Sequence, residues 1–396
     1  MPTVVIAPDG FGGTLSAAEA AEAIASGWRA IRPDDELVLV PMSDGGEGLL
    51  DVVQRPDDVR HVTEVAGPLG HPLDAAMLLR ADGSVLIESA LACGLALVAP
   101  HRRAPLRTTT YGVGQLLEAA RALGARRILV GLGGSATVDG GAGALMGLGL
   151  RPTLEDGSGL KVGAADLERV AAVSVGWRSD WSDVEVELLA DVTTPLTDAA
   201  QVFGPQKGAS PDEVERLRAG LDRWADVIER DLVPAGEGRR PGGTLEDAGG
   251  TFEDAGGALA DAAAPEARSP RLRDLPATGA AGGLGYALVA ALGARFRVGS
   301  EAVGELVGLP AAIATADLVV TGEGRLDATT GAGKVVTYVA GCARAHGLRV
   351  HAVVGQRGPG APALDDVQEA SPGGPPPDPV VDVREAAGRS ASVWQP

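Results

Sequence analysis

Acidic side chains recur at the carboxyl ends of predicted β-strands. The acids at or just past these short apolar runs are Asp9, Asp44, Glu47, Asp191, Glu323 and Asp327. In open α/β sheets, ligands bind at this edge. Phosphoryl transfer needs such groups, some to hold Mg²⁺ and one to accept the proton of the attacking hydroxyl. Any one of them could instead cap a helix or a turn, but together they favour a catalytic site.

Glycine-rich loops follow several of the same strands, and the longest runs from Gly131 to Gly143. Backbone N–H groups at a helix start can converge on phosphate oxygens only where no Cβ stands in the way. In this loop Ser135 and Thr137 could add hydroxyl donors, and Asp139 could hold a metal ion or orient the loop. The pattern predicts a phosphate-binding loop.

Two common nucleotide motifs fit this chain poorly. The stretch around Gly333 and Lys334 lacks the first glycine and the hydroxyl of a Walker A motif. The spacing Gly131-x-Gly133-x-x-Ala136 matches the loose dinucleotide fingerprint, which a run rich in glycine and alanine satisfies by chance. A nicotinamide-dependent hydroxy-acid reductase therefore stays an alternative.

Lysine is scarce in this chain, and its three lysines are Lys161, Lys207 and Lys334. Lys207 and Lys334 both stand beside glycines, so each is a candidate to neutralise phosphate charge. Arg325 is another, because its planar fork suits a carboxylate or a phosphate. The competing interpretation for all three is a surface ion pair.

The elements that would position these residues alternate between strands and helices. We expect strands over 3–7, 37–40, 85–88, 127–130, 186–190 and 318–321, with the last regular strand at 350–354. A capping box, Ser16-x-x-Glu19, predicts a helix over 17–29. Apolar periodicity predicts further helices over 112–123 and 211–232. Helices alternating with apolar strands indicate an α/β fold, and 396 residues suggest two domains.

Composition excludes several classes of partner. A net charge of −19 opposes binding to nucleic acid, which needs clustered lysine and arginine. No apolar run approaches a membrane span. Cys93 and Cys342 are far apart and form no metal or redox motif. The N-terminus begins directly with a strand pattern, without a signal sequence, so we expect a cytoplasmic enzyme.

Two segments show no sign of a packed core. Within 234–275 a seven-residue unit with paired glycines repeats, and one apolar residue per unit buries too little to offset the ordering entropy. We expect a mobile surface insertion there rather than a functional lid. The proline-rich tail over 371–396 is expected to be poorly ordered.

Taken together, the motifs resemble one family, the bacterial glycerate kinases of the two-domain type. The matching stretches follow the family's order: Ile6–Asp9, Leu15–Ala17, Ser43–Gly48, Gly67–Gly70, Gly131–Gly143, Asp191–Leu196, Phe203–Gly208, Gly279–Gly285 and Thr321–Asp327. They cover about 3–355 of the chain. Several are too long to be chance matches.

The resemblance implies two α/β domains. A Rossmann-like or flavodoxin-like domain is formed by both chain ends, over 1–64 and 286–370, and a second mixed α/β domain, 65–285, is inserted between them. Members transfer the γ-phosphate of ATP, with Mg²⁺, to a hydroxyl of D-glycerate. The relatives that this chain resembles most mainly give 2-phosphoglycerate rather than 3-phosphoglycerate.

Three departures from the family stand out. Gly12 occupies a position where many relatives carry a lysine, so Lys207, Lys334 or an arginine would have to supply that charge. Ala332 replaces a histidine often found before the late lysine. The family's closing strand and helix are expected to be missing or replaced by the tail. A catalytically impaired relative that only binds glycerate is therefore a further alternative.

These observations give a set of roles to test. Asp191 or Asp44 would be the base, and Lys207 and Lys334 would balance the transferring phosphoryl group. Glu323 and Asp327 would hold Mg²⁺. The remaining assignments are substrate contacts from Asp9, Ser43 and Arg325, and nucleotide contacts from Gly133, Gly134, Ser135, Thr137, Gly282 and Gly283. The sequence leaves open whether the chain is a monomer or a homodimer.

Overall fold

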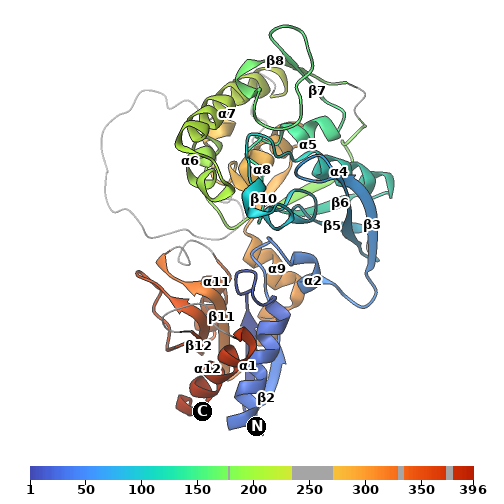
Figure 1. The fold of residues 1–396 in the computed structure, drawn as a ribbon. Helices are drawn as coiled ribbons and strands as arrows, with labels where there is room; N and C mark the ends of the chain where they lie inside the picture. Colours follow the sequence, from blue (N-terminus) through green and yellow to red (C-terminus); the bar gives the residue numbers. More distant parts are fainter. Residues whose placement is uncertain (177–178, 234–270, 329–333, 372–377) are drawn as a thin grey trace, which may run out of the picture. The chain divides into compact units, whose positions relative to one another are not determined.

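A computed structural model describes residues 1–176, 179–233, 271–328, 334–371 and 378–396 (Figure 1). The chain divides into two compact units. We call Met1–Asp58, Leu189–Asp191 and Val298–Pro396 the terminal unit, and Val59–Leu188 with Val192–Arg297 the inserted unit. Most of the repeat-containing segment predicted over 234–275 lies outside the described residues.

The terminal unit is built on a parallel sheet of five strands in the order β13-β12-β11-β1-β2. Both chain ends contribute to it, as the resemblance implied, and the fold class is confirmed. Its elements are β1 (Thr3–Pro8), α1 (Ala17–Ile31), β2 (Glu36–Leu39), α2 (Leu49–Val53), α9 (Gly299–Val307), α10 (Leu309–Ile313), β11 (Leu318–Leu326), α11 (Val335–Ala345), β12 (Arg349–Arg357), β13 (Asp366–Glu369) and α12 (Pro379–Val393).

The inserted unit is built on a mixed sheet of six strands in the order β10-β9-β6-β5-β4-β3. Its strands are β3 (Val59–Ala66), β4 (Pro72–Leu79), β5 (Ser84–Glu88), β6 (Arg127–Gly131), β9 (Glu185–Leu189) and β10 (Arg295–Arg297), with a separate hairpin of β7 (Arg151–Leu154) and β8 (Val170–Ser174). Its α-helices are α3 (Ala90–Cys93), α4 (Tyr111–Ala122), α5 (Ala142–Gly147), α6 (Ala199–Phe203), α7 (Pro211–Asp231) and α8 (Ala280–Leu292).

The first helix forms where the capping box predicts it. The Ser16 hydroxyl accepts the N–H of Glu19 at 3.2 Å, and the Glu19 carboxylate accepts the N–H of Ser16 at 2.8 Å. Both bonds satisfy donors that a helix start leaves without partners. Ile24 and Trp28 are fully buried on the face that packs into the core of the terminal unit.

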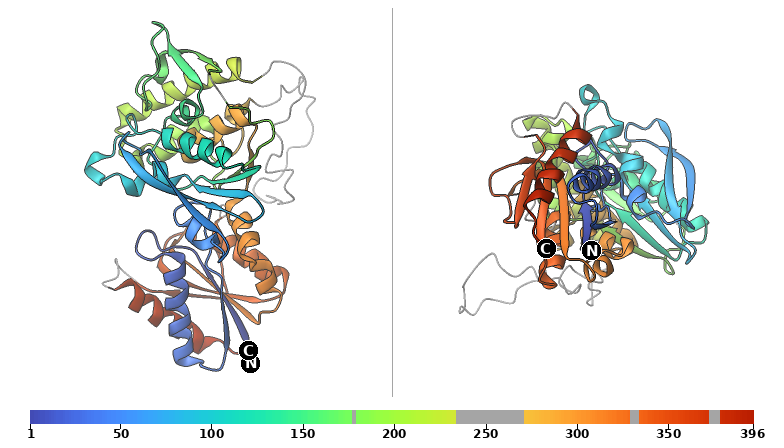
Figure 2. Two further views of the ribbon diagram at one scale, coloured as in Figure 1. Left: turned by 90° about the vertical axis from the view of Figure 1, so that its right-hand side faces the viewer. Right: turned by 90° about the horizontal axis from the view of Figure 1, so that it is seen from below.

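The C-terminal tail was predicted wrongly. Residues 379–393 form α12, which lies beside α1 (Figures 1 and 2). Val383, Ala386 and Trp394 are buried in the same core as Trp28. Burying a valine side chain stabilises a fold by about 1.5–3 kcal/mol, so this short apolar stripe is enough to dock the helix. The closing strand is also present, as β13, so 350–354 does not hold the last strand.

The late strand is longer than predicted. β11 continues to Leu326 because its parallel register with β12 extends from Leu318–Arg349 to Leu326–Arg357. Glu323 and Arg325 therefore lie within a strand rather than in the loop after it. Successive side chains of a strand point to opposite faces, so Glu323 and Arg325, two residues apart, are placed on the same face.

The boundary between the units also differs from the predicted positions. The first unit boundary falls after Asp58, since β3 pairs with β4 along 59–66. The last falls at Val298, after β10 has joined the sheet of the inserted unit.

Candidate active site

Four carboxylates interact in the terminal unit, and we call Asp9, Asp44, Asp191 and Glu323 the acidic cluster. Asp9 follows β1, Asp44 follows the segment after β2, and Asp191 follows β9, while Glu323 lies within β11. Parallel strands bring their carboxyl ends to one sheet edge, which is why β1 and β11 place Asp9 and Glu323 together. The sequence predicted all four residues as functional.

The other three members of the acidic cluster raise the pKa of Asp9. Burial raises the pKa of Asp9 well above its usual range, and the negative charge of Asp44 raises it further. Glu323 and Asp191 add to the same shift. The N–H of Gly10, which donates to the Asp9 carboxylate at 2.7 Å, opposes it. Negative charge is thus concentrated where little water can screen it.

Asp191 is held by the start of α9. Both of its carboxylate oxygens accept the N–H of Ser300 at 3.1 Å. Burial, followed by the charge of Asp44, raises the pKa of Asp191 to about 8 despite this bond. Gly299 makes the arrangement possible, because a Cβ there would lie 2.0 Å from the Asp44 carbonyl oxygen.

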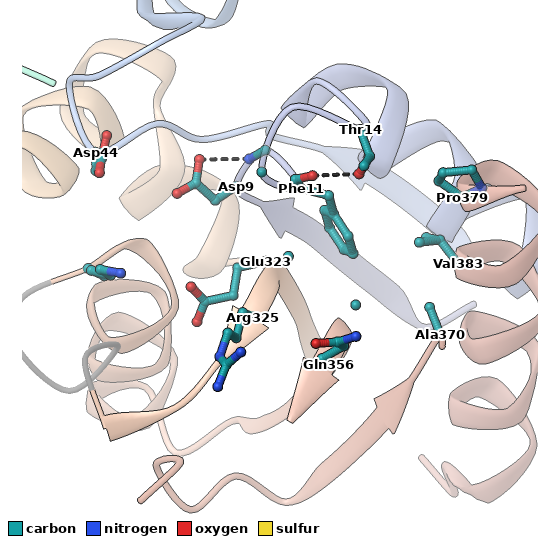
Figure 3. Close-up of a pocket in the computed structure, with 15 residues that line it drawn as sticks. Asp9, Phe11, Thr14, Asp44, Glu323, Arg325, Gln356, Ala370, Pro379 and Val383 are labelled. Atoms are coloured by element: carbon teal, nitrogen blue, oxygen red, sulfur yellow. Dashed lines mark hydrogen bonds between the residues drawn. The ribbon is translucent and has the colours of Figure 1, made fainter. Parts of the chain in front are cut away.

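A cavity of about 430 Å³ adjoins the acidic cluster within the terminal unit (Figure 3). Asp9, Asp44 and Glu323 line one side of it. Phe11 and Val383 line the other side, so α12 contributes to the cavity. The volume is in the range of small-molecule sites.

Basic groups line the same cavity. Lys334, at the start of α11, and Arg325 both face it, and so does Gly12. Gly12 has a φ of +53°, which favours glycine over a side chain such as lysine. Two basic side chains therefore line the cavity together with Gly12. Lys207 belongs to the inserted unit and is not one of the residues that line this cavity.

Asp327, one of the two predicted magnesium ligands, forms an ion pair with a basic side chain. Its carboxylate accepts from the Arg325 guanidinium at 2.8 Å, whereas Glu323 lines the cavity. Among the described residues, no group of three or more His, Cys, Asp or Glu side chains is arranged to hold a metal ion. Mg²⁺ commonly takes one or two carboxylates and completes its shell with water and phosphate oxygens. A site on the acidic cluster would have to be of that kind.

Ser43 has a local structural role. Its side chain is buried, and its hydroxyl accepts the N–H of Gly45 at 3.2 Å. The neighbouring Asp44 carboxylate accepts the N–H of Gly46 at 2.8 Å. Together these bonds fix the turn that presents Asp44.

The long glycine loop of the inserted unit uses its amides internally. Asp139 is fully buried, and its carboxylate accepts the N–H groups of Thr110, Gly141 and Gly143 at 2.8, 3.1 and 3.2 Å. Burial raises the pKa of Asp139, and these donors oppose the shift. Part of the predicted phosphate cradle thus already binds an anion of its own chain.

Lys207 is also held within this loop. Its ammonium is buried and donates to the Ser135 hydroxyl at 2.9 Å and to the Thr137 carbonyl at 2.7 Å. Burial lowers the pKa of Lys207 to about 8. The structure therefore brings together three predicted site residues, Lys207, Ser135 and Thr137, in an arrangement that fixes the loop.

Gly282 and Gly283 face protein backbone. Both have positive φ, +67° and +94°, at the start of α8. A Cβ on Gly282 would lie 2.0 Å from the Thr137 carbonyl oxygen, and one on Gly283 would lie 2.7 Å from the Gly140 Cα. Both residues are buried, so close packing explains these glycines without a nucleotide. Gly133 and Gly134 are the more accessible part of the loop, and Gly134 is exposed with a φ of +64°.

Sequence reasoning missed the residues that complete the site. Gly299 and Ser300 position Asp191, and Phe11 and Val383 line the cavity. The apolar spacing of Val383, Ala386 and Ala387 was a detectable signal for α12. No comparable local signal linked Gly299 to Asp44, since 255 positions separate them.

Searching the described residues also reveals no helix long and apolar enough to span a membrane.

Comparison with known proteins finds relatives in one family. A model of the glycerate kinase family matches residues 4–372. A glycerate kinase of Bacillus subtilis (strain 168) is 38% identical over 358 residues, which are 89% of this chain and 84% of that protein. A glycerate 2-kinase of Escherichia coli (strain K12) is 35% identical, again over 89% of this chain and 84% of that protein.

A solved structure shares the fold. The crystal structure of a protein from Salmonella typhimurium LT2, assigned as a glycerate kinase 2, has a TM-score of 0.75 and 37% identity, covering 99% of this chain and 97% of that one. The α/β fold with acids at its strand ends, together with these relatives, defines a kinase of small molecules. The chain belongs to the glycerate kinase family.

Proposed function

We propose that this kinase transfers the terminal phosphoryl group of ATP, with Mg²⁺, to a hydroxyl of D-glycerate, and that 2-phosphoglycerate is the product. The observation that supports the proposal best is the acidic cluster beside a cavity that also contains Lys334 and Arg325. A phosphorylated nucleotide with its metal supplies charges of both signs, and such a cavity matches them.

The acidic cluster fits a divalent cation. Burial and mutual repulsion hold the pKa of Asp9 high, so the cluster would be stabilised by a positive ion. Glu323 and Asp9 offer the oxygen ligands that Mg²⁺ prefers. When bound there, Mg²⁺ would neutralise negative charge on the phosphate oxygens. Asp327 is better explained as the partner of Arg325.

Asp191 is the better of the two candidate bases. A carboxylate whose pKa is about 8 can hold a proton at neutral pH once it has taken it from a hydroxyl. In the proposed step, the glycerate oxygen bonds to the γ-phosphorus, and the bond from that phosphorus to the bridging oxygen breaks. ADP leaves, and the hydroxyl proton passes to Asp191.

The basic side chains would bind the anionic parts of both substrates. Lys334 and Arg325 are suited to a phosphate and to the glycerate carboxylate, because both line the cavity beside the acids. In the inserted unit, Gly133, Gly134 and Ser135 remain the proposed contact with nucleotide phosphates. Lys207 would act there by holding Ser135 in place.

The test is ADP release measured with glycerate, tartronate and no acceptor, with and without EDTA. We expect turnover that requires glycerate and Mg²⁺, with the phosphorylated carbon identified by ³¹P and ¹³C NMR of the product. NADH oxidation without ADP release would indicate the reductase instead. Glycerate binding without turnover would indicate an impaired relative. Phosphate on the terminal carbon would contradict the assignment of 2-phosphoglycerate alone.

A further inference from the structure

The edge strand of the inserted unit is long and regular. β3 covers Val59–Ala66 and ends the sheet order, with β4 as its one neighbouring strand among the described residues (Figure 1). Its register with β4 is unbroken over all eight residues, and it contains no proline. Proteins usually protect such an edge with proline, a bulge, a short strand or charged side chains, because its unpaired N–H and C=O groups invite another strand.

The two faces of β3 differ. Val65 is buried and faces α4, since a Cβ on Gly112 of that helix would meet Val65 and Ala66. Arg60, Val62 and Glu64 share the opposite face, and all three are exposed. Val62 exposes 54% of its surface, which is unusual for a valine in the middle of a strand.

Two acidic residues lie opposite each other in the β3–β4 pair. Glu64 stands directly opposite Asp74 in the β3–β4 register. Like charges placed opposite each other destabilise a sheet. A cation beyond the edge strand would relieve this repulsion.

A second copy of β3 can supply that cation. In an antiparallel pair of two β3 strands related by a two-fold axis at Val62, Arg60 of each copy lies opposite Glu64 of the other. Val62 then lies opposite its own copy, and Val59 lies opposite Val65. Shifting the axis to His61 or Thr63 pairs Arg60 with Val62 or with Ala66, so both charge pairs are lost. Of these three registers, the one centred on Val62 is the one that pairs Arg60 with Glu64.

We propose that two copies of the chain associate through β3 in this register, which joins their six-stranded sheets into one. The occupant of the edge is thus a second copy of this chain. The self-complementary order of Arg60, Val62 and Glu64 supports this choice, because a two-fold interface requires a surface that fits itself. Each Glu64 would lie between its own Asp74 and the partner copy's arginine.

Charge exchange provides the first test. Sedimentation equilibrium of the full chain should show a dimer whose dissociation constant rises about tenfold in Arg60→Glu and in Glu64→Arg. Mixing these two variants should restore association, because each then meets its opposite charge. The double variant Arg60→Glu/Glu64→Arg should dimerise by itself. A monomer at every concentration, or a dimer that neither variant weakens, would overturn the proposal.

Disulfide formation provides a second test that does not depend on charge. In a Cys342→Ser background, Val62→Cys should form an intermolecular disulfide on mild oxidation, since residues opposite each other have Cβ atoms about 4.5–5.5 Å apart. Val59→Cys is the matched control, because Val59 is equally exposed but would lie about 20 Å from its copy. Crosslinking of Val59→Cys in preference to Val62→Cys would exclude this register. Circular dichroism and turnover should be unchanged in all variants, because none of these residues lines the cavity.

Discussion

The Asp191 carboxylate accepts the N–H of Ser300 through both of its oxygens, at 3.1 Å each. Asp191 therefore has a structural role, at the start of α9, besides the catalytic one proposed for it. A substitution that removes the charge but keeps the hydrogen bond separates these two roles.

Asp191→Asn should lower kcat by about 10²–10⁴-fold while leaving the fold intact. The asparagine can still accept from Ser300 through its side-chain carbonyl, but it cannot take a proton from the hydroxyl. Steady-state kinetics and circular dichroism would measure the two effects. Glu47→Gln is the control, because Glu47 is an exposed acid in the turn that follows Asp44. Near-normal turnover in Asp191→Asn would remove it from the mechanism.

The pKa of Asp191 also predicts a pH dependence of activity. With a pKa of about 8 in the free enzyme, most Asp191 is protonated at neutral pH. We expect kcat/KM for glycerate to rise with pH through about 8 and then level off. A profile that stays flat from pH 6 to pH 9 would argue against this base.

The raised pKa of Asp191 should also make stability depend on pH, but stability should fall where activity rises. The pKa of Asp191 is raised from 3.8 to about 8 on folding, so the folded state holds more protons between these values. Stability should therefore fall as pH rises across that window. Denaturant unfolding of Mg²⁺-free protein would measure the slope, which should be smaller in Asp191→Asn. An equal slope in both proteins would assign the pH dependence to other groups.

The lowered pKa of Lys207 predicts a second change in stability, at higher pH. Burial lowers its pKa from 10.5 to about 8, so the folded state holds fewer protons than the unfolded state between these values. Stability should rise with pH across this window, and Lys207→Met should remove that rise. Lys161→Met is the control, since Lys161 is exposed in the same unit. Retention of the rise in Lys207→Met would show that Lys207 is not its source.

Alanine substitutions at Gly282 and Gly157 would distinguish the stability cost of close packing from that of a positive φ. Both have positive φ, but a Cβ on Gly282 meets the Thr137 carbonyl at 2.0 Å, while one on Gly157 meets nothing within 4 Å. Gly157→Ala should lower the free energy of unfolding by about 1–2 kcal/mol. Gly282→Ala should lower it by more than about 4 kcal/mol, because backbone must also move. Equal losses, measured by urea unfolding, would show that Gly282 is not needed for packing.

Much of the fold and part of the candidate site could be predicted from local sequence. Helix α1 follows from its capping box, and α7 from its apolar stripe, because each signal lies within a few turns of one helix. The acids of the cluster were found because each follows or ends an apolar strand. The tail was misread because one proline-rich stretch hid the apolar residues of α12 that follow it.

The sequence by itself determined the α/β pattern, the family and the acids at the strand ends, since these depend on residue order and short-range periodicity. Tertiary structure decided which glycines face the protein's own backbone and which acids share a site. It paired Asp327 with Arg325, enclosed Lys207 within its loop, and brought Gly299 against Asp44. Such contacts join distant parts of the chain, and only close packing in three dimensions selects them.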